Sequence, residues 1–437
     1  MKRIVLFFFA AMILASCAKT PQPEQTVVEE ADVFKDNSPD DDGYGVLTKS
    51  EEAKLSRVNQ FAFSLLKKVD EMKPGSTYVF SPMSMAYVLG MLSEGTAGTT
   101  RDEICSALGF GLSDREEISS FLKSLTAKVE RSLSPAQEEA YAEEGLSPAD
   151  EEEAPLKIAN IIIADTGHPI KASYRESVMD FYSAMVENLD FEKEDVAQYI
   201  NDWASDYTDG RINKVTDRII GQACCLNAID FNAKWQKADP FNVQRDLFLG
   251  ETEQRTEQIL SDPLRGVYYY KGEDFGLVEI PLKDKRNYIA YNYRFVILLP
   301  DPGLRISNIA LTDEIWQQAT SSATHLIADL SFPKFSTSFS GFEDRIADLL
   351  QSAGISTVFS DDADFSALTD SDVAIKDFRH LSNISVDEYG VTASAASYSS
   401  WGSGSPLPDI VFHANRPFVF AVTEKTTGAI LFLGCYR

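Results

Sequence analysis

Histidine, a common general base and metal ligand in proteins, is rare in this chain. Its histidines are His168, His325, His380 and His413, and none belongs to the HExxH motif of zinc hydrolases. No serine lies in the G-x-S-x-G turn that exposes a nucleophile, although catalytic groups can also converge from distant positions. We therefore predict that the protein is not an enzyme and that it needs no metal or other cofactor.

The stretch from residue 386 to residue 417 differs in composition from the rest of this acidic chain, whose formal net charge is -27. After the acidic pair Asp387 and Glu388, no charged residue occurs before Asp409. Tracts of Gly, Ser and Ala are usually solvated linkers because they cannot bury enough apolar surface to fold. A linker would account for Gly402–Ser405.

The first half of this stretch is better explained as a potential strand. Every second residue from 391 to 399 is small or β-branched: Val391, Ala393, Ala395, Ser397 and Ser399. A strand sends alternate side chains to opposite faces, so one face of this segment would fit a tight slot in a sheet. The sequence therefore predicts a loop outside the core that could become a central strand inside it.

Two motifs in this stretch resemble the serpin family. Val386–Ala396 resembles the serpin hinge, and Phe412–Phe418 resembles the signature that follows the reactive loop. The resemblance implies an α+β fold with three β-sheets, about eight to nine helices and an exposed reactive-centre loop near residues 388–409. It also implies a metastable inhibitor. A serine or papain-like cysteine protease would cut the loop, and the loop would then insert into the main sheet and trap the acyl-enzyme.

The hinge sequence separates inhibitory from non-inhibitory serpins. The family assigns it to Glu388, Gly390, Val391, Thr392, Ala393, Ser394, Ala395 and Ala396. No proline or charged residue, which would be costly to bury in a strand, occurs from 391 to 400, and this favours an inhibitor. Val391 is larger than the usual threonine, and Ser394 and Ser397 also depart from the pattern. The alternative is a non-inhibitory serpin that acts as a binding or carrier protein.

The family's loop length indicates where a protease would cut. Counting forward from the hinge puts the reactive bond between Gly404 and Ser405, whereas counting back from Phe412 allows Ser403. Trp401 and Tyr398 are larger targets nearby. Because the loop contains no Lys or Arg, we expect an elastase-like target first and a chymotrypsin-like or papain-like target second.

The resemblance also assigns buried residues that control opening of the sheet. The shutter, a polar cluster under the main sheet, would consist of Ser81, Ser84, Asn227 and His380, and Trp235 would lie at the breach, where the loop first enters. The alternative interpretations are a helix cap for each serine, a satisfied core imidazole for His380 and an ordinary core side chain for Trp235.

The first 17 residues resemble a bacterial lipoprotein signal. Lys2 and Arg3 precede an apolar run too short to span a bilayer, and Leu14–Cys17 resembles a lipobox with Cys17 as the lipidated residue. The alternative is a signal peptide that is cut elsewhere. Residues 18–45 are predicted to be a disordered acidic spacer and residues 46–437 a single serpin domain. The protein is thus expected to be exported and membrane-anchored, in the periplasm or at the cell surface.

The charge balance limits the partners. With 67 Asp and Glu against 40 Lys and Arg, nucleic acid is not expected as a partner, and contact with a membrane is expected only through the lipid. The segment Arg131–Pro155 is acidic where some serpins carry a basic site, so no activation by sulfated polysaccharides is expected. We expect a monomer whose partner is the target protease.

The remaining cysteines, Cys105, Cys224, Cys225 and Cys435, are predicted to be mostly buried thiols, with a bridge between two of them as the alternative. Hydrophobic periodicity predicts the main elements. Helices are expected over 50–72, 174–189 and 200–212. Strands are expected over 78–80, 156–164, 278–282, 293–300 and 326–335, with a hairpin over 418–433 that turns at Gly428. Asp230 occupies a position where the family usually has an aromatic residue.

Overall fold

The computed structural model describes residues 46–111, 115–130, 155–193, 195–219, 221–237, 239–283, 293–339, 346–373, 375–392 and 407–437. All of them fall in one compact unit, Asn37–Arg437. The α-helices in these ranges are α1 (Lys49–Met72), α2 (Pro82–Gly95), α3 (Gly98–Ala107), α4 (Arg115–Val129), α6 (Ala172–Tyr182), α7 (Asp195–Tyr207), α8 (Asp313–Ser321) and α9 (Ile346–Ser352). Within the described chain, no helix has the length and apolarity needed to cross a membrane.

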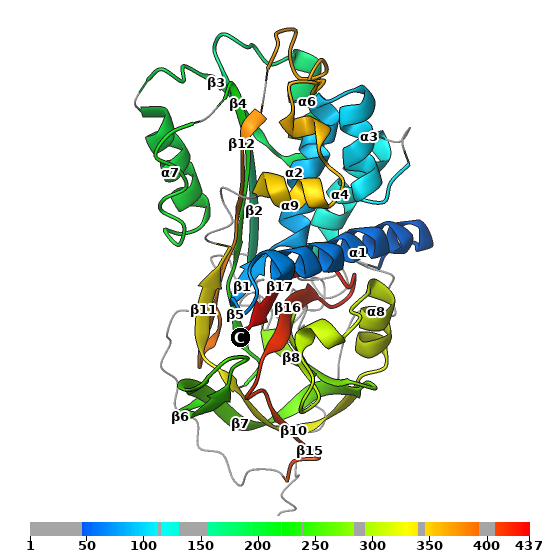
Figure 1. Cartoon of the computed structure of the whole chain (residues 1–437), viewed down its shortest axis with the longest axis vertical. Helices are drawn as coiled ribbons and strands as arrows, with labels where there is room; N and C mark the ends of the chain where they lie inside the picture. Colours follow the sequence, from blue (N-terminus) through cyan, green and yellow to red (C-terminus); the bar gives the residue numbers. More distant parts are fainter. Residues whose placement is uncertain are drawn as a thin grey trace, which may run out of the picture. The chain divides into compact units, whose positions relative to one another are not determined.

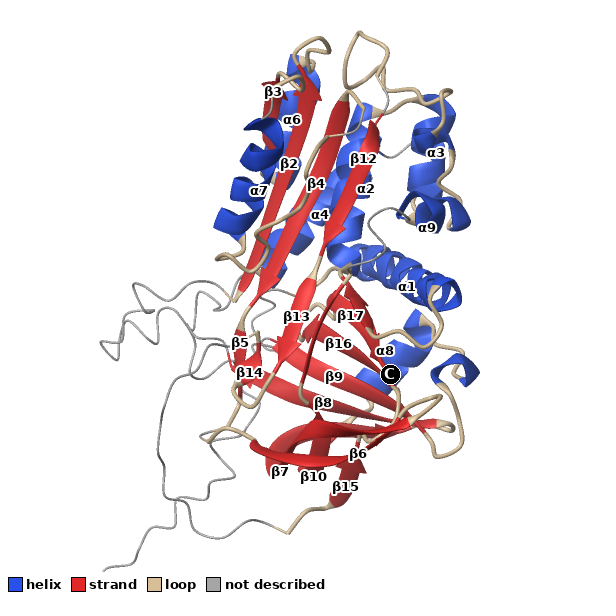
Figure 2. Ribbon diagram, turned by 60° about the vertical axis from the view of Figure 1, so that its left-hand side comes forward, coloured by secondary structure: helices blue, strands red, loops and turns tan. Residues whose placement is uncertain are grey.

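The strands form two hydrogen-bonded sheets (Figures 1 and 2). The first has four strands in the order β12 (Ile375–Leu381), β4 (Ala223–Phe231), β2 (Leu156–Asp165) and β3 (Met185–Leu189). The path of the second is β1 (Tyr78–Phe80), β17 (Ile430–Tyr436), β16 (Phe418–Glu424), β9 (Tyr293–Pro300), β8 (Phe275–Lys283), β5 (Ala233–Trp235), β14 (Gly390–Val391), β13 (Asn383–Val386) and β11 (Phe335–Ser338). Off this path lie β6 (Asn242–Leu249), β7 (Gln254–Lys271), β10 (Thr324–Pro333) and β15 (Ile410–His413).

The four-stranded sheet is buried on both faces. Ile162 and Ala164 of β2 face the main core with α2, whereas Ile161 and Ile163 face a second core under α7. Burial on both faces explains why β2 is an almost uninterrupted apolar run in the sequence. The predicted strand over 156–164 is therefore confirmed as β2.

The larger sheet combines two layers that the resemblance to serpins predicts as separate sheets. The 18-residue strand β7 pairs with β6 and β10 along most of its length and with β8 at its C-terminal end. One long strand thus joins the β8–β9–β16–β17 layer to the β6–β7–β10–β15 layer (Figure 2). The third predicted sheet is present as a layer, but it shares a hydrogen-bonded strand with its neighbour.

Most predicted elements are confirmed with small changes in extent, but the helix predicted over 200–212 is α7, which begins and ends five residues earlier. Helix α1 begins one residue before the predicted start because Thr48 caps it in a reciprocal capping box with Glu51. Ser81 caps α2 and Pro82 takes its first position, as predicted. The predicted hairpin is β16–β17, where Gly428 has φ 75°.

Two predicted elements are wrong. The helix predicted over 174–189 ends at Tyr182, because Ser183 adopts a left-handed backbone (φ 49°), and Met185–Leu189 instead pair with β2 as strand β3. The strand predicted over 326–335 is interrupted at Lys334, whose N–H donates to the carbonyl of Gln258 (2.7 Å). Residues 333 and 335 therefore end β10 and begin β11, respectively.

Candidate functional site

Four buried polar residues join the first turn of α2 to the middle of the four-stranded sheet. The hydroxyl of Ser81 accepts a hydrogen bond from the backbone N–H of Ser84 (3.1 Å). Asn227 in β4 lies directly opposite His380 in β12. The Ser84 hydroxyl contacts both, since it donates to Asn227 Oδ1 and lies 3.0 Å from His380 Nδ1. The structure thus brings together all four residues assigned to the shutter.

The imidazole of His380 is held in one neutral tautomer. Its Nε2 accepts a hydrogen bond from the backbone N–H of Ser81 (2.9 Å), so Nε2 carries no proton. Because the Ser84 hydroxyl gives its proton to Asn227, His380 Nδ1 must be the donor toward Ser84. Burial lowers the pKa of His380 from 6.5 to about 3. Protonating Nε2 would set two N–H groups against each other and break the cluster.

Asn160 extends this cluster across the sheet, and the sequence analysis missed it. Asn227 Nδ2 donates to Asn160 Oδ1 (2.8 Å), and Asn160 Nδ2 donates to the carbonyl of Tyr182 at the end of α6 (2.9 Å). The available signal was a single amide inside the β-branched run of β2, since a buried amide requires partners. Polar side chains therefore link β12, β4 and β2 in one buried row.

The hinge begins as a short strand between the continuations of β4 and β12. β5 follows β4 after Asn232, and β13 follows β12 after Ser382 (Figure 2). Between them lies β14, where Val391 pairs antiparallel with Ala233 of β5 and with Val386 of β13. Beyond this point β4 and β12 pair directly with each other, in parallel. A strand that continued from β14 would have to part these two strands.

Close backbone approach explains the glycine of the hinge. A Cβ atom on Gly390 would lie 2.2 Å from the carbonyl oxygen of Ala233 and 2.7 Å from the Cα of Lys234. No other residue fits there unless the strands move apart. Val391 is completely buried, so the first residue of the predicted slim face already packs in the sheet.

Trp235 fixes the turn that leads into β14. Its indole N–H donates to the carbonyl of Asp387 (2.7 Å), and its ring packs edge-on against Phe241, Phe295 and Phe332 at centroid distances of 5.6–5.7 Å. Glu388 forms an ion pair with Lys334 of the neighbouring chain segment, with 2.5 Å between Glu388 Oε2 and Lys334 Nζ. Trp235 therefore lies beside the first residues of the hinge, and its assignment to the breach stays a prediction.

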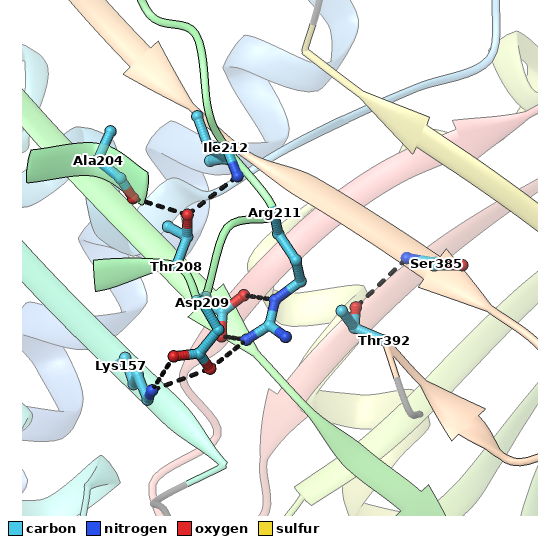
Figure 3. Close-up of polar contacts among 9 residues, drawn as sticks. Lys157, Ala204, Thr208, Asp209, Arg211, Ile212, Ser385 and Thr392 are labelled. Atoms are coloured by element: carbon cyan, nitrogen blue, oxygen red, sulfur yellow. Dashed lines mark hydrogen bonds and ion pairs between the residues drawn. The ribbon is translucent and has the colours of Figure 1, made fainter. Parts of the chain in front are cut away.

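A charged network lies on the face of β4 opposite to the one that carries Asn227 and the buried polar cluster (Figure 3). Arg211, just after α7, donates through Nε and Nη2 to both carboxylate oxygens of Asp230 and also contacts Asp209. Asp209 accepts in turn from Lys157 of β2, and this hydrogen bond holds the pKa of Asp209 below its ordinary value. Asp230 thus occupies the position where the family usually has an aromatic residue. Its carboxylate anchors Arg211 through ionic contacts.

Several assigned residues lie outside the described ranges. These are Cys17 with the predicted signal and spacer, the acidic segment 131–154, and the loop residues Ala393, Ser394, Ala395, Ala396, Trp401, Ser403, Gly404 and Ser405. The description resumes at Leu407, which is 90% exposed. Cys105, Cys224, Cys225 and Cys435 are buried thiols, as predicted.

A pocket of about 760 Å³ lies away from this region, between α1, α8 and the β16–β17 turn. Glu279 and Arg294 line it, with Glu279 Oε2 4.0 Å from Arg294 Nε. Burial raises the pKa of Glu279 to about 7, although Arg294 and Lys425 oppose the shift. Within the described residues, Glu279 Oε1 has no hydrogen-bond partner. The pocket therefore contains one buried carboxyl oxygen without a hydrogen-bond partner among the described residues.

Comparisons with known proteins agree with this architecture. Residues 56–437 match the family model described as serpin (serine protease inhibitor). Serpin-Z2A of Triticum aestivum is 28% identical over 419 residues, covering 89% of this chain and 97% of its own. Intracellular coagulation inhibitor 2 of Tachypleus tridentatus is 26% identical over 406 residues, covering 89% of this chain and 92% of its own.

Among solved structures, human thyroxine-binding globulin in complex with thyroxine has the same fold, with a TM-score of 0.73 and 23% identity over 88% of this chain and 98% of its own. The predicted serpin fold class is therefore confirmed. Members of this family are in general protease inhibitors and not enzymes, which agrees with the family description that the sequence matches. From its fold, the site geometry and these matches, the chain belongs to the serpin family.

Proposed function

We propose that this protein is an inhibitory serpin that traps a protease as a covalent acyl-enzyme. The observation that carries the proposal is the position of β14, which pairs on both sides with the continuations of β4 and β12 and runs antiparallel to both continuations. The loop that follows Val391 would need only to continue in the same direction to become a new central strand. Its slim alternate side chains suit that position.

The strand register supports insertion at the shutter. Val391 lies opposite Ala233 on one side and Val386 on the other. Six residues further along the loop is Ser397, and six residues back along each neighbour are Asn227 and His380. Both registers therefore predict that an inserted Ser397 would separate this pair. Alternate residues share a face, so the Ser397 hydroxyl would point toward the buried cluster, like the side chain of Val391.

Insertion would supply the free energy for trapping. It exchanges one parallel ladder, β4–β12, for two antiparallel ladders, a net gain of about ten backbone hydrogen bonds at roughly 1 kcal/mol each. That total is comparable with the stability of a whole domain, ~5–15 kcal/mol. The uncleaved form would thus be kinetically stable, not the state of lowest free energy.

The chemistry of capture belongs to the protease. Its serine or cysteine attacks the carbonyl carbon of the bait residue, the peptide bond to the next residue breaks, and the new amino terminus leaves while the acyl bond remains. Insertion would carry the acylated protease across the sheet before water hydrolyses that bond. The uncharged loop supports an elastase-like target cut at Gly404–Ser405, with chymotrypsin-like or papain-like cleavage near Trp401 as the alternative.

The first test is adduct formation with an elastase-like protease. We expect an SDS-stable species with the summed mass of protease and inhibitor, and mass spectrometry of the released peptide will identify the reactive bond. Val391→Arg should be cleaved without forming the adduct, because a charge at this buried position would keep β14, where the inserted strand begins, out of the sheet. Val243→Arg adds the same charge on exposed β6 and should still form it. Rapid cleavage of the unmodified protein without any adduct would refute trapping.

We also propose that a lipid on Cys17 anchors the protein to a membrane, in the periplasm or at the cell surface, with the acidic segment 18–45 as a spacer. The lipobox-like sequence supports this proposal. Cys17→Ser should release the protein from the membrane fraction and abolish labelling by a radioactive fatty acid. Labelling that persists in this variant would contradict the assignment.

A second candidate, supported by the pocket at Glu279, is a non-inhibitory serpin that carries a small ligand. The buried Glu279 Oε1, which lacks a hydrogen-bond partner among the described residues, suits a ligand with a hydroxyl or amino group on an apolar body. Thyroxine is a suitable probe because it is bound in the similar thyroxine-binding globulin. Saturable binding that Glu279→Gln weakens, together with cleavage without an adduct, would favour this candidate over the inhibitor.

A further inference from the structure

Thr392 has an unusual backbone at the point where strand β14 ends. Its φ is 57°, in the left-handed region, and it is the one β-branched residue with a positive φ among the residues described. Side chains branched at Cβ are strained in this conformation, whereas Asn and Gly tolerate it. The other non-glycine residues with positive φ are Ser183 and Asp209, which lack this branching.

The hydrogen bonds around Thr392 explain why this conformation persists. Its backbone N–H donates to the carbonyl of Ser385 in β13 (2.5 Å), as in an ordinary antiparallel pair. The Ser385 N–H donates in return to the Thr392 hydroxyl (3.3 Å), drawn in Figure 3. In a regular ladder that N–H would bind the carbonyl of Thr392. The hydroxyl thus takes the place that the carbonyl has in a regular ladder.

We infer that Thr392 is a catch that ends β14 after Val391 in the uncleaved protein. The left-handed backbone is incompatible with strand geometry at this residue, and the hydroxyl satisfies the N–H of Ser385 that a longer strand would use. In an inserted loop Thr392 would be extended, its strain would be relieved, and its carbonyl would replace its hydroxyl as acceptor. Only the behaviour of Thr392 in the inserted loop rests on the proposed function. Its role in the uncleaved protein does not depend on that proposal.

The catch makes opposite predictions for intact and loop-cleaved protein. Thr392→Val keeps the branched shape but removes the acceptor. In the intact protein it should raise the unfolding equilibrium constant about fivefold, because Ser385 loses its partner. Thr392→Asn tolerates the left-handed backbone and keeps an acceptor, so it should lower that constant about threefold. After cleavage Thr392→Val should have no effect, and Thr392→Asn should be destabilising because Asn is disfavoured in strands.

The measurement is urea unfolding of the full chain before and after cleavage of the loop. Thr256→Val makes the same change at an exposed position of β7 and should leave both forms unaltered. The catch is overturned if Thr392→Val leaves the intact protein unchanged or weakens both forms equally. A different result would refute loop insertion alone. In that case cleavage of the unmodified protein would add no stability, while Thr392→Val would still weaken the intact form.

Discussion

His380 makes the stability of the closed sheet depend on pH. Its folded pKa of about 3 lies below the ordinary value of 6.5, so between these values the unfolded chain binds a proton that the folded chain excludes. The contribution of neutral His380 is complete above pH 6.5 and is lost as the pH falls toward 3. At pH 5 the loss amounts to ~2 kcal/mol.

The prediction is that His380→Gln removes this part of the acid sensitivity. Its unfolding free energy should fall less between pH 7 and pH 5 than that of the unmodified protein, by ~2 kcal/mol, although the variant is less stable at pH 7. Urea unfolding at both pH values provides the measurement. His413→Gln, at an exposed strand position, should stay within ~0.5 kcal/mol of the unmodified protein. Equal pH dependence in His380→Gln would contradict the role given to this imidazole.

For individual residues, the sequence predicted the site only where a family motif contains them. Resemblance identified Ser81, Ser84, Asn227 and His380 as one group, but not Asn160, whose partners come from a neighbouring strand and from the end of α6. The backbone of Thr392 was also beyond prediction, because a left-handed β-branched residue contradicts local preference and exists only through the contacts of β13.

The charged network over β4 and β2 attaches the chain after α7 to the sheet. Asp230 is buried, so removing Arg211 alone would leave an uncompensated carboxylate. Arg211→Leu should therefore lower the unfolding free energy by roughly 1–3 kcal/mol, reduced from the fully buried case because Arg211 is partly exposed. The double variant Arg211→Leu/Asp230→Phe restores an aromatic residue and should recover most of the loss. Urea unfolding that ranks the double variant below the single one would refute this account.

The extent of elements was predictable when their ends carried a local signal. Thr48 with Glu51, Ser81 with Pro82, and Gly428 mark boundaries that the structure confirms to within a residue or two. Residues 183–189 carry no such signal. Their apolar spacing suits a helix, and pairing with β2 decides in favour of a strand. The break at Lys334 is equally a tertiary effect, since it depends on a carbonyl of β7.

For the whole molecule, the central claim is that the intact fold is not its own most stable arrangement. Two observations support it: β14 is already paired on both sides where the inserted strand would begin, and β4 and β12, which that strand would separate, form a parallel ladder. The buried cluster that links β4 and β12 stabilises the closed sheet and so opposes insertion. Fold class followed from the sequence because its landmarks span the chain. The pairing of β14, where the inserted strand would begin, did not follow from the sequence. It depends on backbones that meet only in three dimensions.

The most direct test compares the melting of intact protein with that of protein cut in the loop. The account predicts that cut protein melts at least about 10 °C higher, as expected when ~10 kcal/mol is added to a domain of this size. Val391→Arg should abolish most of the difference. Equal melting temperatures for cut and intact protein would contradict the claim that free energy is stored in the uncleaved fold.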